Sequence, residues 1–265
     1  TEESIGRLFM AGILPGLLMM ALFMLAIWIV TLRDPAAGPR GERVAFRERF
    51  ALLLKALPLI VVIVVSIGGI YLGVFTPVEA SGVGAALTIL LAFATRSIDL
   101  KSFATSVMET VTTSTMLYMI VIGANVLNPF LSLTGVPGGL EAGLNALGLG
   151  TYGTLAVILL SYVVLGMFLD AIAVMLIVTP IILPVLGPLG IDPVHFGIVL
   201  IVNMEIAFLT PPIGLNLFVL SSISKAPMSE AIRGMIPFVL IMACFLILIT
   251  YVPEITLWLP NRLMN

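Results

Sequence analysis

The sequence predicts an all-α polytopic membrane protein, and three observations support this fold class. Of the 265 residues, 60% are hydrophobic and only 10% are charged. The mean hydropathy of +1.23 exceeds what a soluble domain of this size can bury. Apolar runs of membrane-spanning length also recur along the chain, and short polar, Pro- and Gly-containing stretches interrupt two of them. A nucleic-acid partner is not expected, because no basic face remains outside the short loops.

Seven apolar runs are long enough to cross a bilayer. They occupy residues 8–32, 56–75, 80–95, 103–131, 154–186, 196–223 and 235–259. The fifth run is too long and too interrupted for one straight helix, because Gly166 and Asp170 lie near its middle and Pro180 and Pro184 in its second half. This pattern predicts a re-entrant helical hairpin, whose two short arms enter and leave the membrane on the same side.

The distribution of Lys and Arg supports the hairpin. Three loops hold most of these residues: Arg33, Arg40, Arg43, Arg47, Arg49 and Lys55 in the first, Arg96 and Lys101 in the second, Lys225 and Arg233 in the third. The loops at 132–153 and 187–194 hold none, so we expect them outside and the basic loops in the cytoplasm. This topology closes only if the 154–186 segment returns to the side from which it entered.

The first basic loop contains the segment 42–55, which is basic on one side and apolar on the other. Such a segment is predicted to lie along the membrane surface. The alternative is a solvated linker whose arginines orient the chain.

The stretch "AFLTPPIGLN" (207–216) predicts a broken helix inside the sixth run. Pro211 and Pro212 lack an N–H, so the carbonyls of Ala207 and Phe208 lose their helical partners. Thr210 is expected to be the N-cap of a second helix that has Pro211 at its first position.

A break of this kind exposes backbone groups of both partial charges. Free carbonyl oxygens suit a cation such as Na⁺, and the positive end of the restarted helix suits a carboxylate. Gly214 permits close approach of a ligand, and Asn216 adds a side-chain amide. The alternative is a simple proline kink, which is common in membrane helices.

Two acidic residues lie near these interruptions. Asp170, in the predicted hairpin tip "LGMFLDAIAV", is a buried carboxylate candidate for function, and it is also well placed to cap the second arm. Glu205 precedes the proline break by about one turn. It either supports a bound cation electrostatically or is paired or protonated within the helix bundle.

Three further polar features have structural interpretations. Thr76, Pro77 and Glu79 form a capping-box pattern, so Glu79 is either a cap or a transport residue. Asn125 and Asn128, with the Thr and Ser residues at 110–115, favour hydrogen bonds between helices. His195 is expected in a loop or at the membrane interface. One His and one Cys are too few for a zinc site, so no metal cofactor is expected.

Three stretches carry a resemblance to a known family: "GIYLGVFTPVEASGVGA", "LGMFLDAIAVMLIVTPIILPV" and "GIDPVHFGIVLIVNMEIAFLTPPIGLNLFVL". They resemble the large membrane subunit of TRAP transporters, the tripartite ATP-independent periplasmic transporters, and the likeness covers nearly the whole chain. The resemblance implies an elevator-type secondary transporter of the ion-transporter superfamily in the inner membrane of a bacterium or archaeon. It also implies a Na⁺ gradient as the driving force and an organic acid such as a C4-dicarboxylate or sialic acid as substrate. A smaller membrane subunit and a soluble periplasmic binding protein would be its partners.

The resemblance also implies two inverted repeats, each with a hairpin and a broken helix. The chain matches only the second repeat, so we expect it to be the C-terminal part of a longer subunit and a single membrane domain over 1–265. Its scaffold would be 1–102, its transport unit 103–233 with the broken helix at 196–223, and its last transmembrane helix 234–265.

The family's second Na⁺ site and half of its substrate pocket fall on residues of this chain. The implied binding residues are Gly166, Phe168, Asp170, Ala207, Phe208, Thr210, Pro211, Pro212, Gly214 and Asn216. Na⁺ would lie near Ala207, Phe208, Thr210 and Asp170, and it would be a coupling ion rather than a cofactor. Glu79, Glu205 and Asn125 are supporting candidates.

Two alternatives differ in class. One is a carboxylate or ion symporter or antiporter of the same superfamily that needs no binding protein. The other is an intramembrane aspartyl protease that uses Asp170 and Glu205 as two carboxylates sharing a proton. The protease signature Gly-x-Gly-Asp is absent, since the chain reads Gly166-Met-Phe-Leu-Asp170, so we predict that the protein is not an enzyme.

Overall fold

The structure is a computed structural model that describes residues 3–35, 38, 41, 45–212 and 214–263. These residues form helices and no strand. In chain order, the helices are α1 (Ile5–Arg33), α2 (Phe46–Tyr71), α3 (Pro77–Ala94), α4 (Leu100–Leu133), α5 (Val136–Ala146), α6 (Gly150–Gly166), α7 (Ala171–Leu186), α8 (Pro193–Phe208), α9 (Leu215–Ser224), α10 (Met228–Tyr251) and α11 (Glu254–Leu263).

Five of these helices are long and apolar enough to cross a membrane. They are α1, α2 from Glu48 onward, α3, α4 and α10. They coincide with the predicted runs at 8–32, 56–75, 80–95, 103–131 and 235–259, so the prediction of an all-α, multi-pass membrane protein is confirmed. The shorter apolar helices α6, α7, α8 and α9 fall in the two runs for which the sequence predicts interruptions.

The chain forms two compact units, one of residues 1–30 and 116–265 and the other of residues 31–115. The smaller unit is built around the helical hairpin α2–α3. The two helices approach closely where Gly84 faces Ser66, because a Cβ at Gly84 would lie 2.8 Å from the Ser66 Oγ. At the start of α3, the Thr76 hydroxyl accepts from the Glu79 N–H and the Glu79 carboxylate accepts from the Thr76 N–H. This capping box confirms the structural reading of Glu79.

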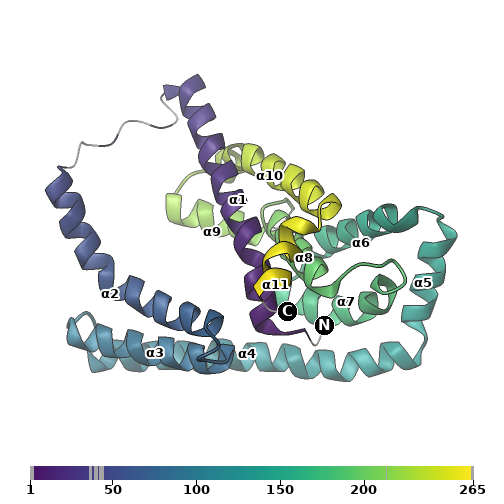
Figure 1. Ribbon diagram of the computed structural model, residues 1–265, viewed down its shortest axis with the longest axis horizontal. Helices are drawn as coiled ribbons and strands as arrows, with labels where there is room; N and C mark the ends of the chain where they lie inside the picture. The colour runs from purple at the N-terminus through teal and green to yellow at the C-terminus, as the bar shows by residue number, and fades with distance from the viewer. Residues whose placement is uncertain (1–2, 36–37, 39–40, 42–44, 213, 264–265) are drawn as a thin grey trace. The chain divides into compact units, whose positions relative to one another are not determined.

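The predicted surface segment 42–55 does not form an element of its own. Residues 42–44 and the Arg47 side chain, like Arg40, lie outside the described part of the chain, and residues 46–55 are the first turns of α2. Helix α2 is visibly bent in Figure 1 and contains Pro58. Proline removes one helical hydrogen bond and is a usual cause of such a bend. The basic segment is therefore joined to the apolar part of α2 through a continuous helix.

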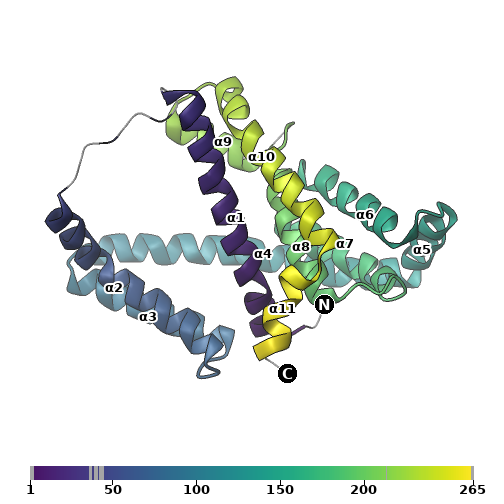
Figure 2. The same ribbon diagram turned by 45° about the horizontal axis from the view of Figure 1, so that its top comes forward.

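The core of the larger unit lies between α6, α7, α8 and α10, and α8 contacts the other three (Figure 2). Tyr162 of α6, Val174 of α7, Val199 of α8 and Phe245 of α10 are all sealed from solvent. Helix α8 is buried on most of its surface, which explains why its sequence is apolar all round rather than on one stripe.

Two helical arms replace the fifth apolar run, as predicted. Helix α6 ends at Gly166 and α7 begins at Ala171, and the Tyr162 hydroxyl lies 3.0 Å from the Thr179 hydroxyl between them. That these arms re-enter the membrane on one side stays a prediction.

Two boundaries differ from those predicted. The last long helix starts at Met228 and ends at Tyr251, where Val252 leaves the helical conformation and Pro253 supplies no N–H; α11 follows as a separate helix. Helix α5 lies in the segment 132–153 that reads as a loop. Its glycines are the reason why the sequence does not predict a helix here. The helix is stabilised by its buried Leu144, which packs on the core.

Candidate functional site

At the first interruption, residues 167–170, a side chain of the turn itself accepts hydrogen bonds from the N–H groups at the start of the next helix. Asp170 is the N-cap of α7, and its Oδ2 accepts from the N–H of Ile172 at 2.9 Å and of Ala173 at 3.4 Å. The capping role predicted for Asp170 is confirmed. Phe168 projects from the turn and is 57% exposed.

The second interruption separates α8 from α9 at residues 209–214. The Thr210 N–H donates to the Ala207 carbonyl at 3.1 Å. The expectation that the Ala207 carbonyl is left without a partner is therefore wrong, because the chain tightens into a three-residue turn before the prolines. Among the described residues, none donates to the Phe208 carbonyl. Pro211 and Pro212 follow in an exposed turn.

The second helix does not start where the sequence suggested. Thr210 is not an N-cap: its hydroxyl donates to the Ile206 carbonyl one turn back, at 2.6 Å. The N-cap is Gly214, with φ of +54°, and it makes no side-chain capping bond. Glycine adopts this left-handed conformation without the steric cost that a Cβ brings.

Carbonyl oxygens gather around Gly214. A Cβ built on this glycine would lie 3.2 Å from the Thr210 oxygen and 3.3 Å from the Phe208 oxygen. The N–H groups of Leu215 and Asn216 have no acceptor among the described residues, whereas the Leu217 N–H bonds to the Gly214 carbonyl. Partial negative charge from two carbonyls and partial positive charge from a helix start thus lie side by side.

Close packing brings the two interruptions together. A Cβ at Gly166, the last residue of α6, would lie 2.9 Å from the Ala207 Cβ and 2.8 Å from the Met204 Cε. Ala207 is completely buried. Small residues on both helices allow this approach, as is common between membrane helices. The end of the first hairpin arm therefore packs against the end of α8, two residues before the break begins.

The other sequence candidates are placed as follows. Asn216 is in the first turn of α9 and exposed. Glu79 lies in the smaller unit. Asn125 does not bridge helices, because its side-chain amide donates to the Val121 carbonyl of its own helix at 2.9 Å. Thr110, Thr112 and Thr115 likewise bond within α4, so the prediction of interhelical bonds is wrong for them.

Asn128 does join two helices. Its amide donates to the Leu176 carbonyl of α7 at 3.1 Å. That carbonyl is available because Pro180, four residues later, has no N–H to offer it. The pattern of a proline and a distant asparagine could have suggested a partnership, but not which asparagine would reach the site.

Sequence reasoning missed Asn203. This side chain is 1% exposed on α8, and its amide donates to the Leu159 carbonyl of α6 at 2.9 Å. Its Oδ1 is buried and has no partner among the described residues. A buried amide in the middle of an apolar helix was the available signal. It fixes α6 against α8 at a point four residues before Ala207 on α8 and seven residues before Gly166 on α6.

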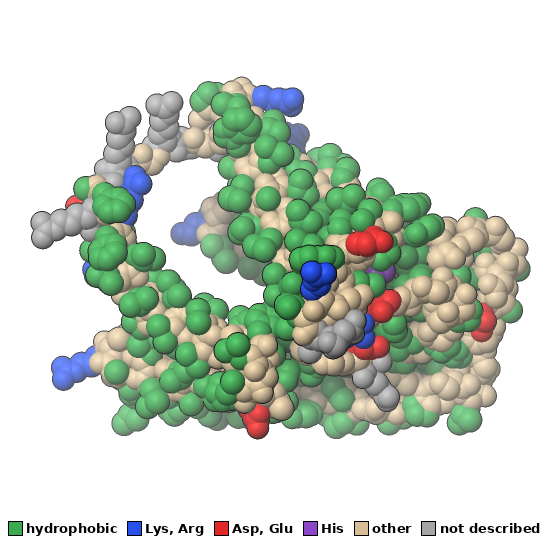
Figure 3. Space-filling model, in the orientation of Figure 1, with side chains coloured by type: hydrophobic (Ala, Val, Ile, Leu, Met, Phe, Trp, Pro, Cys, Tyr) green, Lys and Arg blue, Asp and Glu red, His purple; other side chains and the backbone are tan. Residues whose placement is uncertain are grey.

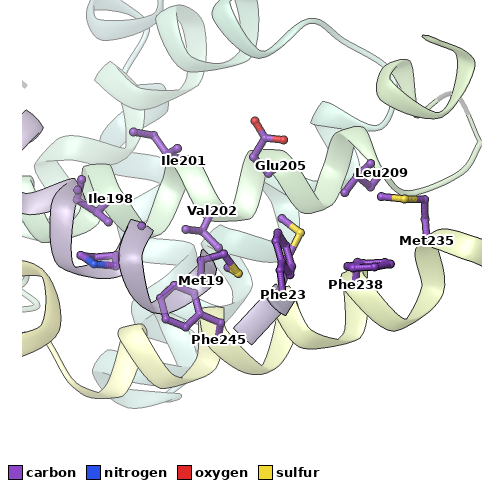
Figure 4. Close-up of a pocket in the computed structure, with 14 residues that line it drawn as sticks. Met19, Phe23, Ile198, Ile201, Val202, Glu205, Leu209, Met235, Phe238 and Phe245 are labelled. Atoms are coloured by element: carbon purple, nitrogen blue, oxygen red, sulfur yellow. The ribbon is translucent and has the colours of Figure 1, made fainter. Parts of the chain in front are cut away.

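Glu205 borders an apolar cavity of about 540 Å³ between α1, α8 and α10. Met19 and Phe23 line it from α1, and Phe238 and Phe245 from α10 (Figure 4). Among the described lining residues, Glu205 is the one that carries a charge, and Figure 4 draws its carboxylate extended away from the aromatic rings. That Glu205 supports a bound cation stays a prediction.

Apolar spanning helices together with two adjoining helix interruptions are typical of one class of protein, the membrane transporters that use broken helices. The family model of the tripartite ATP-independent periplasmic transporter, DctM component, matches residues 1–255, and the chain belongs to this family. The resemblance found in the sequence is confirmed.

Three curated relatives illustrate the range of the family. A C4-dicarboxylate TRAP transporter large permease protein of Pseudomonas aeruginosa is 38% identical over 99% of this chain and 61% of its own length. A sialic acid TRAP transporter large permease protein of Vibrio cholerae is 34% identical over 98% of the chain and 61% of its own length. A 2,3-diketo-L-gulonate TRAP transporter large permease protein of Escherichia coli is 30% identical over 99% and 61%.

These findings decide two predictions. The relatives are permease proteins of transporters rather than enzymes, so the intramembrane protease alternative is not supported and the prediction of a non-enzyme is confirmed. Family membership and the five apolar spans confirm a multi-pass inner-membrane protein. The chain spans about three fifths of the length of these relatives.

Proposed function

We propose that this chain is part of the permease subunit of a Na⁺-coupled secondary transporter that imports small organic acids delivered by a periplasmic binding protein. The observation that carries the proposal is the junction at Gly214, where the Phe208 and Thr210 carbonyls converge beside the uncapped start of α9. One small region there offers ligands for a cation and dipoles for a carboxylate.

The Na⁺ ion would lie near Ala207, Phe208, Thr210 and Asp170. Phe208 contributes a carbonyl that no described residue occupies. The Ala207 carbonyl accepts one hydrogen bond from Thr210, but a carbonyl oxygen has two lone pairs and can still coordinate an ion. The Gly166–Ala207 contact supports including Asp170, because it holds the start of the capped turn next to the break.

The substrate's carboxylate would bind at the start of α9. The N–H groups of Leu215 and Asn216 lack acceptors among the described residues, and the helix dipole favours an anion there. The names of the three relatives all describe organic acids. We therefore propose that the substrate of this chain also carries a carboxylate. Phe168, Pro211 and Pro212, exposed in the two turns, would border the bound molecule.

Movement would follow an elevator scheme. In this scheme, the transport unit at 103–233, with its re-entrant hairpin, slides against the scaffold at 1–102. The sealed contact between Gly166 and Ala207 supports movement of hairpin and broken helix as one body. Most side chains of α2 and α3 are exposed and apolar. Such surfaces suit lipid and the small membrane subunit as neighbours.

Uptake by the reconstituted system tests the proposal. The full-length large subunit and the small subunit would be placed in proteoliposomes with and without a Na⁺ gradient, and with and without the binding protein. We expect uptake of a labelled C4-dicarboxylate or sialic acid to require both. Uptake driven by Na⁺ but indifferent to the binding protein would favour the binding-protein-independent symporter or antiporter, and uptake without a Na⁺ gradient would contradict the coupling.

The site itself is tested by the double variant Thr210→Val/Asn216→Leu. We expect the Na⁺ concentration for half-maximal uptake to rise about tenfold or more, since polar contacts near an ion are lost. Thr115→Val is the matched control, because Thr115 makes the same bond to its own helix, 2.8 Å to the Val111 carbonyl. Unchanged Na⁺ activation in the double variant would remove the site from these residues.

A further inference from the structure

A second cavity, of about 340 Å³, lies between the start of α6, the loop before α8 and the junction of α10 and α11. Its volume is within the range of small-molecule sites. Unlike the apolar cavity beside Glu205, it has several polar lining residues: Thr151, Tyr152, Asp192, His195 and Thr250. None of them belongs to the helix interruptions described above.

The hydrogen bonds of His195 determine which of its ring nitrogens can accept a hydrogen bond from a ligand in this cavity. The side chain is 4% exposed, and its Nδ1 lies 2.7 Å from the Thr256 hydroxyl. That hydroxyl also lies 2.8 Å from the Pro253 carbonyl, to which it can donate its single hydrogen. The tautomer that suits both contacts carries its proton on Nδ1. In neutral histidine, the Nε2 is then an acceptor. Among the described residues, no group donates to this Nε2.

The neighbouring polar groups also present lone pairs. The Thr250 hydroxyl donates its hydrogen to the Leu246 carbonyl of its own helix at 2.7 Å. Asp192 uses its Oδ1 to accept from the N–H groups of Val194 and His195, which leaves Oδ2 without a donor among the described residues. Burial lowers the pKa of His195, and the negative charges of Asp192 and Glu254 oppose this shift without reversing it. Figure 3 shows red Asp and Glu side chains set among green hydrophobic ones on the face that it draws.

We propose that this cavity binds a primary ammonium group. An ammonium brings three N–H donors and a positive charge, which match the acceptors at Asp192, His195 and Thr250. An anion would meet the carboxylate charge of Asp192. A tightly held metal ion would need more ligands, and no group of three or more His, Cys, Asp or Glu side chains among the described residues is arranged to hold one. Tyr152, stacked on Tyr251 at 4.5 Å, adds an aromatic face at the rim.

The ammonium group could belong to free ethanolamine or to the headgroup of phosphatidylethanolamine, and the test separates them. The protein, purified in detergent, is heated while tryptophan fluorescence is followed, with increasing ethanolamine, choline or ethylene glycol. We expect a saturable rise of Tm with ethanolamine only, because choline has the same charge but no N–H and ethylene glycol has no charge. In detergent micelles doped with lipid, phosphatidylethanolamine is compared with phosphatidylcholine.

Two variants and a control sharpen this experiment. Asp192→Asn keeps an oxygen that can cap α8 but removes the charge, so the apparent Kd for ethanolamine should rise at least about tenfold. His195→Asn places its amide nitrogen where the imidazole has Nδ1, so it keeps a donor for Thr256 and removes the Nε2 acceptor, and we expect a similar loss. Asp99→Asn is the control, since Asp99 accepts from the Ser102 N–H at 2.7 Å at the start of α4.

Each outcome decides the proposal. A response to ethanolamine identifies a free amine, and a response to phosphatidylethanolamine alone identifies the headgroup; either supports the site when both cavity variants weaken it. Equal responses to ethanolamine and choline, no response to any amine, or unchanged responses in both cavity variants would overturn it. None of these results depends on whether the protein transports an acid with Na⁺.

Discussion

The two helix interruptions of the larger unit differ in how their backbone groups are satisfied. At the hairpin turn, Asp170 accepts from two N–H groups at the start of α7 and closes that helix end. At the proline break, Gly214 starts α9 without any side-chain cap, and the Phe208 carbonyl has no donor among the described residues. Unsatisfied backbone groups in a membrane cost several kcal/mol each, which supports our proposal that a ligand partners the open break.

A missing helical hydrogen bond inside α7 shows how the chain supplies a donor from another helix. Pro180 leaves the Leu176 carbonyl of α7 without its helical donor, and Asn128 of α4 supplies one at 3.1 Å. The open state of the break at 209–214 is therefore not a general feature of prolines in this protein. This contrast supports our proposal that a ligand binds at the Gly214 junction and none is needed at the Leu176 carbonyl of α7.

The largest expected effect concerns the contact that joins the two interruptions. Gly166→Val would force a Cβ within 3 Å of Ala207 and Met204, and we expect a loss of about 1–3 kcal/mol of stability with lower Tm and lower uptake. Gly123→Val is the control, since nothing lies within 4 Å of a Cβ there. Equal thermal stability of the two variants would show that hairpin and broken helix do not pack as described.

The hydrogen bond that Asn128 supplies to the Leu176 carbonyl can be removed, and the helical bond that Pro180 lacks can then be restored. Asn128→Leu removes the donor to the Leu176 carbonyl, and we expect a loss of about 1–3 kcal/mol. Adding Pro180→Ala restores a helical N–H to that carbonyl, so the double variant should recover much of the lost stability in a double-mutant cycle. Asn125→Leu, whose amide bonds only its own helix, should have a smaller effect. Additive effects of the two substitutions would argue against the Asn128–Pro180 link.

The open break is probed at its glycine. Gly214→Ala places a Cβ against two carbonyls at a φ of +54°, and the left-handed conformation alone costs about 1–2 kcal/mol. We also expect a higher Na⁺ concentration for half-maximal uptake. Gly214→Asn tolerates the conformation better but still crowds the carbonyls, so it should recover stability without recovering the Na⁺ response. Gly187→Ala, with open space and φ of −57°, is the control. If Gly214→Asn recovered both the stability and the Na⁺ response, the ion would bind at another place.

The smallest effect is expected at the closed turn. Asp170→Ala should cost about 1 kcal/mol through the lost cap, whereas Asp170→Asn keeps a capping oxygen and should cost only a few tenths. The Na⁺ dependence of uptake separates the two functions of this residue. A normal Na⁺ response in Asp170→Asn would make Asp170 a cap alone, and a weakened response at normal Tm would make it part of the ion site.

Local patterns predicted those features whose partners lie within a few residues. The capping box of Thr76 and Glu79, the cap at Asp170 and the interruption at Pro211–Pro212 each depend on neighbours in the sequence, and the structure has all three. The same local reasoning misplaced the start of α9, because the Thr210 hydroxyl has two acceptable local partners. It bonds to the Ile206 carbonyl instead of capping a new helix.

By itself, the sequence determined that this protein is an all-α membrane protein with two interrupted apolar runs and a family resemblance, because hydropathy, proline and glycine act through local chemistry. Only the tertiary structure decided which distant groups meet. It set Gly166 against Ala207, brought the Asn128 amide to the Leu176 carbonyl, and placed the His195 Nδ1 against the Thr256 hydroxyl. Such pairings depend on how helices pack across tens of residues, and no period or short motif along the chain specifies them.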